Sequence, residues 1–215
     1  MATRLYLPSS GSAPSSPNGA SMWERQVSLF ARYPTLTTKA NTALTDFADA
    51  FGSTSSSQSL WLMWVSDTLD VDQTITGTSS IVVRGLEAAA ADDLHLAYAL
   101  RVMQGDTTTE RGTLITQGAT ATEFTTSAQT RIFSAQALSS VAALAGDRIA
   151  IDIGFHGLTP QSGATGTLRF GDPTGTADFA LTSGLTTDLC PWVELSQTLT
   201  FGTPAAGSSK FFAFF

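Results

Sequence analysis

The sequence predicts an all-β protein: an antiparallel, jelly-roll-like β-sandwich with one short helix and extended N- and C-terminal arms. Several stretches alternate apolar and polar residues, which is typical of strands with one face in a core and the other in solvent. Glycine, threonine and aspartate separate these stretches, as expected for turns between antiparallel strands. At 215 residues the chain is long enough to form one sizeable core.

The first half of the chain contains one ambiguous strand and one clear strand. Residues 23–30 fit both a helical stripe that includes Phe30 and a strand alternation that includes Leu29, and the β-like surroundings favour the strand. Residues 60–65 form a continuous apolar run between polar clusters. This run predicts a strand that is buried on both faces.

The remaining strands are predicted from alternation. Residues 94–102 alternate most regularly, and residues 149–155 repeat the pattern, so His95 and His156 are both expected on outer, solvent-facing sides. Shorter or less regular strands are expected at residues 74–86, 112–116, 167–171 and 193–201.

Residues 135–145 predict the single helix. Leu138, Val141 and Leu144 recur every three residues, and Gly146 follows where a glycine commonly ends a helix.

Both ends of the chain are expected to contact other subunits. We divide the chain into an N-terminal arm and linker (1–20), a β-sandwich domain (21–201) and a C-terminal arm with an aromatic anchor (202–215). Clustered aromatic side chains dominate binding energy when they fill a partner's groove, and the alternative is that they fold back onto their own sandwich. The predicted partner-binding residues are Leu5, Tyr6, Leu7, Phe211, Phe212, Phe214 and Phe215.

Charge and composition disfavour several classes of partner. The net charge is −7 and charged residues make up only 13% of the chain, so the surface repels phosphate and we expect no nucleic-acid partner. No stretch is long and apolar enough for a membrane helix, and an acidic surface does not attract anionic lipid, so we expect no membrane partner. Cys190 is the only cysteine, which excludes a disulfide within the chain and a Cys-ligated zinc site.

The sequence shows no catalytic signature, and we predict no enzyme, no catalytic residue, no cofactor and no bound metal. It lacks a nucleophile elbow, a phosphate-binding glycine loop and a zinc-protease motif, although a carboxylate pair of the glycosidase type would leave no sequence pattern. Two acidic loops offer calcium-type oxygen ligands, but their spacing matches no EF-hand. These loops contain Asp67, Asp70 and Asp72, and Asp172, Asp178 and Asp188.

Tryptophans could form a stacking platform for a sugar. Trp61 and Trp64 belong to the apolar run and are expected in the core, as large aromatic residues usually are. Trp192, at the start of the last strand, is the one tryptophan for which the sequence leaves both a buried and a partly exposed position open.

Five stretches are similar to a group of tailed-phage and prophage proteins of about this length. The resemblance implies a virion structural or accessory protein with a β-sandwich domain that is assembled in the host cytoplasm. It supplies no catalytic residues for this chain. We therefore expect a homo-oligomer that contacts other virion subunits in a capsid decoration or a tail, with a host-surface glycan as the alternative partner. The stretches are ATRLYLP (2–8), VSDTL (65–69), AGDRI (145–149), TLRFGD (167–172) and DLCPWVEL (188–195).

Overall fold

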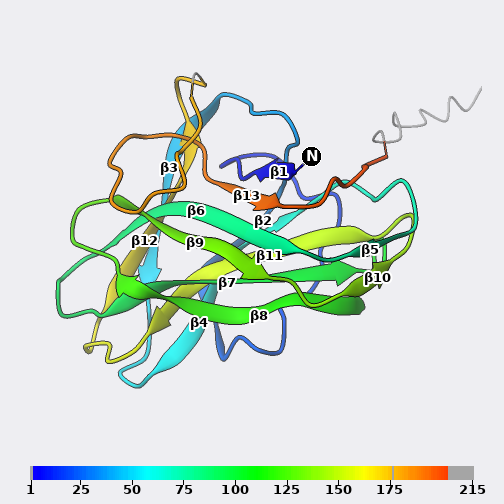
Figure 1. Cartoon of the computed structure of the whole chain (residues 1–215). Coiled ribbons are helices and arrows are strands. Elements are labelled where there is room, and N and C mark those ends of the chain that lie inside the picture. The colour runs from blue at the N-terminus through cyan, green and yellow to red at the C-terminus, as the bar shows by residue number, and fades with distance from the viewer. Residues whose placement is uncertain (1, 176, 203–215) are drawn as a thin grey trace, which may run out of the picture.

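The computed structural model describes residues 2–175 and 177–202, which form thirteen strands and no helix (Figure 1). The predicted all-β sandwich is confirmed. Among the described residues no helix could span a membrane. The strands are β1 (Thr3–Tyr6), β2 (Arg25–Pro34), β3 (Thr42–Ala50), β4 (Ser57–Val65), β5 (Gln73–Ile75), β6 (Thr78–Glu87), β7 (Leu94–Met103), β8 (Glu110–Glu123), β9 (Gln129–Ala137), β10 (Val141–Ala143), β11 (Arg148–Gly157), β12 (Thr165–Asp172) and β13 (Trp192–Leu195).

Two main sheets pack face to face. The first sheet has the order β1-β13-β6-β12-β3, and β9 pairs with the other edge of β6. The second has the order β2-β4-β11-β7-β8. All strand pairs within the described residues are antiparallel except β2 with β4. A small third pairing joins β5 to β10.

The main core lies between the sheets and is built from the alternating apolar residues. Leu96, Tyr98 and Leu100 of β7 face Ile81 and Val83 of β6 across the sandwich, within one cluster of buried side chains. Such burial is worth about 1.5–3 kcal/mol for each large apolar side chain. The alternation in the sequence therefore marks the inner faces of both sheets correctly.

A β-bulge in β4 brings two consecutive side chains, Trp61 and Leu62, into this core. Ile153 of β11 pairs with Leu62 and the next residue, Gly154, pairs with Leu60, so Trp61 is the extra residue. A Cβ atom at Gly154 would lie 1.9 Å from the Ser59 carbonyl oxygen, so only glycine permits this close approach.

The outer faces of β7 and β11 are buried, contrary to the prediction of solvent-facing sides. All ten residues of β7 are buried, and β11 is buried except at His156. Residues 9–24, which we call the covering segment, cross this face, and Ala20 and Trp23 pack there against Leu60 and Met63. The Ser/Pro/Gly-rich linker is thus part of the packed domain.

The predicted helix at residues 135–145 is wrong. These residues form the end of β9, a three-residue connection (138–140), β10 and the start of the turn before β11; in β10, Val141 and Ala143 are buried and Ala142 is exposed. The inward positions therefore alternate in twos, and Leu144 is 42% exposed. Gly146 does adopt a positive φ of 91°, but in the turn that precedes β11.

The N-terminal arm is also corrected. β1 pairs with β13, and the side chains of Leu5 and Leu7 are fully buried in the core of their own chain. They are therefore not available to a neighbouring subunit. Tyr6 is half-buried, and its hydroxyl donates to Asp178 over 2.9 Å. The other predicted partner-binding residues, Phe211, Phe212, Phe214 and Phe215, lie outside the described residues.

Candidate functional site

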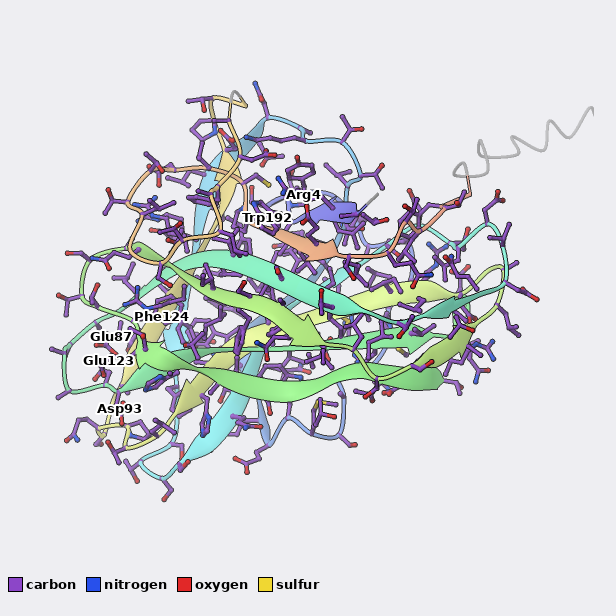
Figure 2. The ribbon with its side chains drawn as sticks, in the orientation of Figure 1. Arg4, Glu87, Asp93, Glu123, Phe124 and Trp192 are labelled. Atoms are coloured by element: carbon purple, nitrogen blue, oxygen red, sulfur yellow. The ribbon has the colours of Figure 1, made fainter. Side chains whose placement is uncertain are left out.

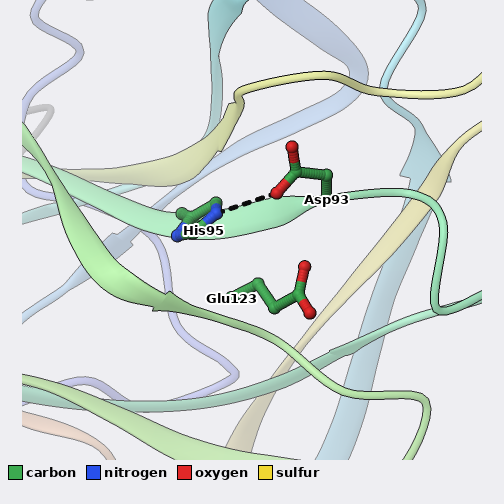
Figure 3. Close-up of side chains that lie close together, drawn as sticks. All are labelled: Asp93, His95 and Glu123. Atoms are coloured by element: carbon green, nitrogen blue, oxygen red, sulfur yellow. Dashed lines mark hydrogen bonds and ion pairs between the residues drawn. The ribbon is translucent and has the colours of Figure 1, made fainter.

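Asp93, His95 and Glu123 converge at one end of the second sheet (Figure 3). Asp93 immediately precedes β7, and His95 of β7 is the direct cross-strand partner of Glu123 of β8. One nitrogen or oxygen ligand atom from each residue lies within 4.8 Å of the other two. The antiparallel pairing of β7 with β8 therefore fixes the spacing of the site.

His95 is 5% exposed and has an acceptor at each ring nitrogen. Nδ1 lies 2.8 Å from the Thr120 carbonyl oxygen, and Nε2 lies 3.0 Å from Asp93 Oδ1. A carbonyl oxygen only accepts, so Nδ1 must carry a proton and donate it. The ionised Asp93 carboxylate also only accepts, so its contact with Nε2 requires either a proton on Nε2 or a cation bound between the two atoms.

The second oxygen of Asp93 is held from outside the site. Oδ2 accepts hydrogen bonds from the main-chain N–H of Thr159, over 2.7 Å, and from its hydroxyl, over 2.5 Å. Burial raises the pKa of Asp93, but the hydrogen bonds from Thr159 and His95 outweigh it and lower the pKa overall. Asp93 is thus an ionised carboxylate with Oδ1 directed at His95.

More carboxylates surround this site than basic groups. Glu87 at the end of β6 is 1% exposed, and Figure 2 shows it at the same end of the sandwich as Asp93 and Glu123. Burial is the main cause that raises the pKa of Glu87 to about 7; the Leu94 N–H opposes it, and the charges of Glu123, Asp92 and Asp93 add to it. This end of the molecule therefore favours an added positive charge.

The guanidinium group of Arg131 in β9 is directed largely at main-chain oxygens. Arg131 donates from Nε to the Glu123 carbonyl over 2.6 Å and from Nη1 to the Thr130 carbonyl over 2.9 Å. Its charge acts on both Glu87 and Glu123. Arg131 therefore balances part of the negative charge, and among the described residues it donates no hydrogen bond to either carboxylate.

The acidic loop between the last strands is neutralised by basic side chains instead of being open to calcium. Asp172 is fully buried and pairs with Lys39 over 2.6 Å. Its Oδ1 also accepts the main-chain N–H groups of Thr174 and Gly175, and its pKa falls well below the usual range because these hydrogen bonds and Lys39 outweigh burial. Asp178 pairs with Arg4, and Asp188 with Arg84.

In the other acidic loop, Asp72 accepts the main-chain N–H of Ala145 over 2.7 Å. This bond fastens the loop before β5 to the turn before β11. Asp67 and Asp70 do not join a metal-type cluster among the described residues.

All four tryptophans are buried, including Trp192, for which the sequence left partial exposure open. Trp192 is 2% exposed, its Nε1 donates to the Phe179 carbonyl over 3.1 Å, and Arg4 stacks over its ring at 4.2 Å (Figure 2). The loop that contains Phe179 covers the outer face of the first sheet. None of these rings offers a flat platform for a sugar.

Two shallow depressions lie next to Arg25. One, of about 400 Å³, is lined by Trp23, Glu24 and Arg32 among others. The other, of about 470 Å³, is lined by Gly52, Ser53, Thr54, Ser162 and Gly163 with Arg25. The first includes one carboxylate and the second none, so neither brings together the carboxylate pair that a glycosidase needs.

Sequence reasoning placed His95 on the outer side of its strand, which is correct, but missed Asp93 and Glu123 as its neighbours. The pairing of β7 with β8 contains four register shifts. Counted from the Met103–Glu110 pair, an unbroken ladder would place Gly118 opposite His95 instead of Glu123. No pattern in the sequence locates these bulges.

Comparisons with known proteins do not place the chain in a family. No protein-family profile and no curated protein matches it. Among solved structures, it was aligned with one titled "Structure of infectious bursal disease virus Gt strain", at 14% identity over 94% of this chain and 50% of that chain, with a TM-score of 0.15. The chain spans half the length of that protein, and a TM-score of 0.15 does not indicate a shared fold.

Proposed function

We propose that the chain is a non-enzymatic structural protein of a tailed-phage particle, which decorates the capsid or forms part of the tail through contacts with other virion subunits. The observation that carries the proposal is where the five stretches of the resemblance lie. Four of them pair two by two in the framework of the sandwich, the fifth (167–172) lies in β12, and none lines either of the two depressions.

The first and last stretches pair with each other. Residues 2–8 contain β1 and residues 188–195 contain β13, and the ladder between these strands runs from Thr3–Leu195 to Tyr6–Trp192. Leu7 extends it, since its N–H donates to the Pro191 carbonyl over 2.9 Å. These two stretches together form one edge of the first sheet.

Two internal stretches also pair with each other. The N–H of Ser66 donates to the Ile149 carbonyl over 2.9 Å, and that of Leu69 donates to the Asp147 carbonyl over 2.7 Å. The Ser66 hydroxyl accepts the Ile149 N–H over 2.8 Å. Stretches that pair in this way belong to a common scaffold. In such a protein, function depends on the surfaces that the scaffold presents, and for a structural subunit these surfaces contact other subunits.

The composition of the surface supports the same role. At one end of the β3–β12 ladder the outward pairs, Ala48–Thr167 and Ala50–Thr165, are small and uncharged, and the next pair along, Asp46–Arg169, is an ion pair. Small uncharged residues cost little to desolvate when another subunit covers them. A glycan-binding role finds less support, because the four tryptophans are buried.

The experiment tests whether the C-terminal phenylalanines, which lie outside the described residues, anchor the chain in the particle. Phage particles are assembled with the wild-type chain and with a variant in which Phe211, Phe212, Phe214 and Phe215 are changed to serine, and the chain in purified particles is quantified. We expect the variant to fold, by circular dichroism, and to be lost from the particles. A folded variant that is incorporated at the wild-type level would contradict the anchor.

A further inference from the structure

We propose that Asp93, His95 and Glu123 bind one Zn²⁺ ion that joins the start of β7 to the end of β8. This inference is independent of the proposed virion role. It rests on the convergence of three ligand atoms, on the buried imidazole and on contacts that hold two of the three ligands from outside the site.

The spacing suits a single small cation. Zinc lies about 2.0–2.2 Å from nitrogen and carboxylate ligands, so tetrahedral ligands are about 3.4 Å apart. Asp93 Oδ1 and His95 Nε2 are 3.0 Å apart, and the three ligand atoms all lie within 4.8 Å of one another. Small side-chain movements, chiefly of Glu123 at the solvent side, would bring all three to coordination distance.

The imidazole is oriented as a metal ligand. Nδ1 donates to the Thr120 carbonyl, which leaves Nε2 directed toward Asp93, where a metal ion would replace the proton that Nε2 shares with the carboxylate. Metal-bound histidines commonly donate their other N–H to a carbonyl or carboxylate, which fixes the ring and its tautomer. At 5% exposure, His95 has little access to water that could stand between Nε2 and the carboxylate.

Asp93 has a comparable outer contact. Thr159 donates two hydrogen bonds to Oδ2, so Oδ1 is the oxygen left for the ion. Thr159 follows the end of β11, and Thr120 belongs to β8. Two of the three ligands are thus fixed by residues that the rest of the sheet positions.

The ligand set favours zinc over calcium or magnesium. Imidazole nitrogen suits zinc and similar transition metals, whereas calcium takes six to eight oxygen ligands. Two carboxylates would neutralise the charge of a divalent ion, and water would complete the coordination.

Isothermal titration calorimetry of the full chain with ZnCl₂, at pH 7 after treatment with a chelator, tests the proposal. We expect one equivalent of Zn²⁺ to bind and to raise the melting temperature. Changing Glu123→Gln should weaken binding at least about tenfold, in line with losses seen when metal-site residues are altered. His95→Gln should do the same.

The controls use the same residue types outside the site. Glu110→Gln changes a glutamate at the other end of β8, and His156→Gln changes the cross-strand neighbour of His95 on β11. Both should bind zinc as the wild type does. Glu123→Gln decides the test if the buried His95 variant fails to fold. Absence of binding by the wild type, or equal binding by Glu123→Gln and the wild type, would overturn the proposal.

Discussion

Arg101 of β7 and Asp152 of β11 form a two-point ion pair that is buried beneath the covering segment. Arg101 Nε lies 3.0 Å from Asp152 Oδ2, and Nη2 lies 3.0 Å from Oδ1. The covering segment completes the network, because Trp23 Nε1 donates to Asp152 Oδ2 and the Asn18 carbonyl accepts from Arg101 Nη2. The covering segment therefore supplies hydrogen bonds that these two buried charges need.

Changing Asp152→Asn should destabilise the protein strongly. It leaves the Arg101 guanidinium, 2% exposed, with only the more distant Glu110 carboxylate, 3.8 Å away, as a counter-charge, and breaking one side of a buried pair typically costs about 3–5 kcal/mol. Chemical denaturation measures the free energy of unfolding. The matched control is Asp46→Asn, which breaks the exposed two-point pair with Arg169 and should cost at most about 1 kcal/mol. Equal losses in the two variants would refute the role assigned to the buried pair.

This pair also shows where sequence reasoning stops. The continuous apolar run at residues 60–65 correctly predicted a strand buried on both faces. Arg101 and Asp152 instead lie at polar positions of alternating strands, which indicates an exposed face. They are buried because a segment distant in sequence covers them, and no local pattern contains that information.

The errors at residues 135–145 and at the N-terminus have related causes. The three-residue spacing of Leu138, Val141 and Leu144 is typical of a helix. Residues 141–143 instead form β10, because their main chain pairs with β5. Leu5 and Leu7 are two residues apart because they are inward positions of an edge strand and its extension, not because they form a free apolar arm.

Changing Leu5→Ala should therefore lower the stability of the isolated chain. Removing a fully buried leucine side chain typically costs about 2–5 kcal/mol. Leu29→Ala is the control, because Leu29 is 54% exposed and its loss should cost within about 0.5 kcal/mol. Thermal or chemical unfolding measures both. A Leu5→Ala chain as stable as the wild type would mean that the N-terminus is an arm after all.

The thiol of Cys190 should be unreactive while the protein is folded. The residue is 1% exposed, and burial raises the pKa of the thiol to about 12, so almost no thiolate forms at pH 8. Labelling with a thiol reagent such as DTNB should be slow in native buffer and rapid in denaturant. Complete labelling of the folded chain within seconds would contradict the buried position next to the Leu7 carbonyl.

Stability should respond to pH through Glu87. Its pKa is raised from 4.5 to about 7 by folding, so the folded chain holds a proton that the unfolded chain releases between these values. The free energy of unfolding attributable to Glu87 therefore falls as pH rises through this window. Arg131, which faces Glu87, offsets part of the effect.

Glu87→Gln removes this titration and retains an oxygen for the Leu94 N–H. In metal-free buffer its stability relative to the wild type should increase by up to about 3 kcal/mol between pH 4.5 and pH 7.5. Urea unfolding at the two pH values measures the difference. A difference between variant and wild type that does not change with pH would show that Glu87 ionises as readily in the folded as in the unfolded chain.

The most direct measurement of the proposed virion role is the number of copies of the chain in purified phage particles, determined by quantitative mass spectrometry against the major capsid protein. A structural protein occupies symmetry-related positions, so we expect a fixed copy number that matches a capsid or tail symmetry and survives washing in high salt. If the chain is abundant in infected cells but absent from the particles, the proposed function is wrong.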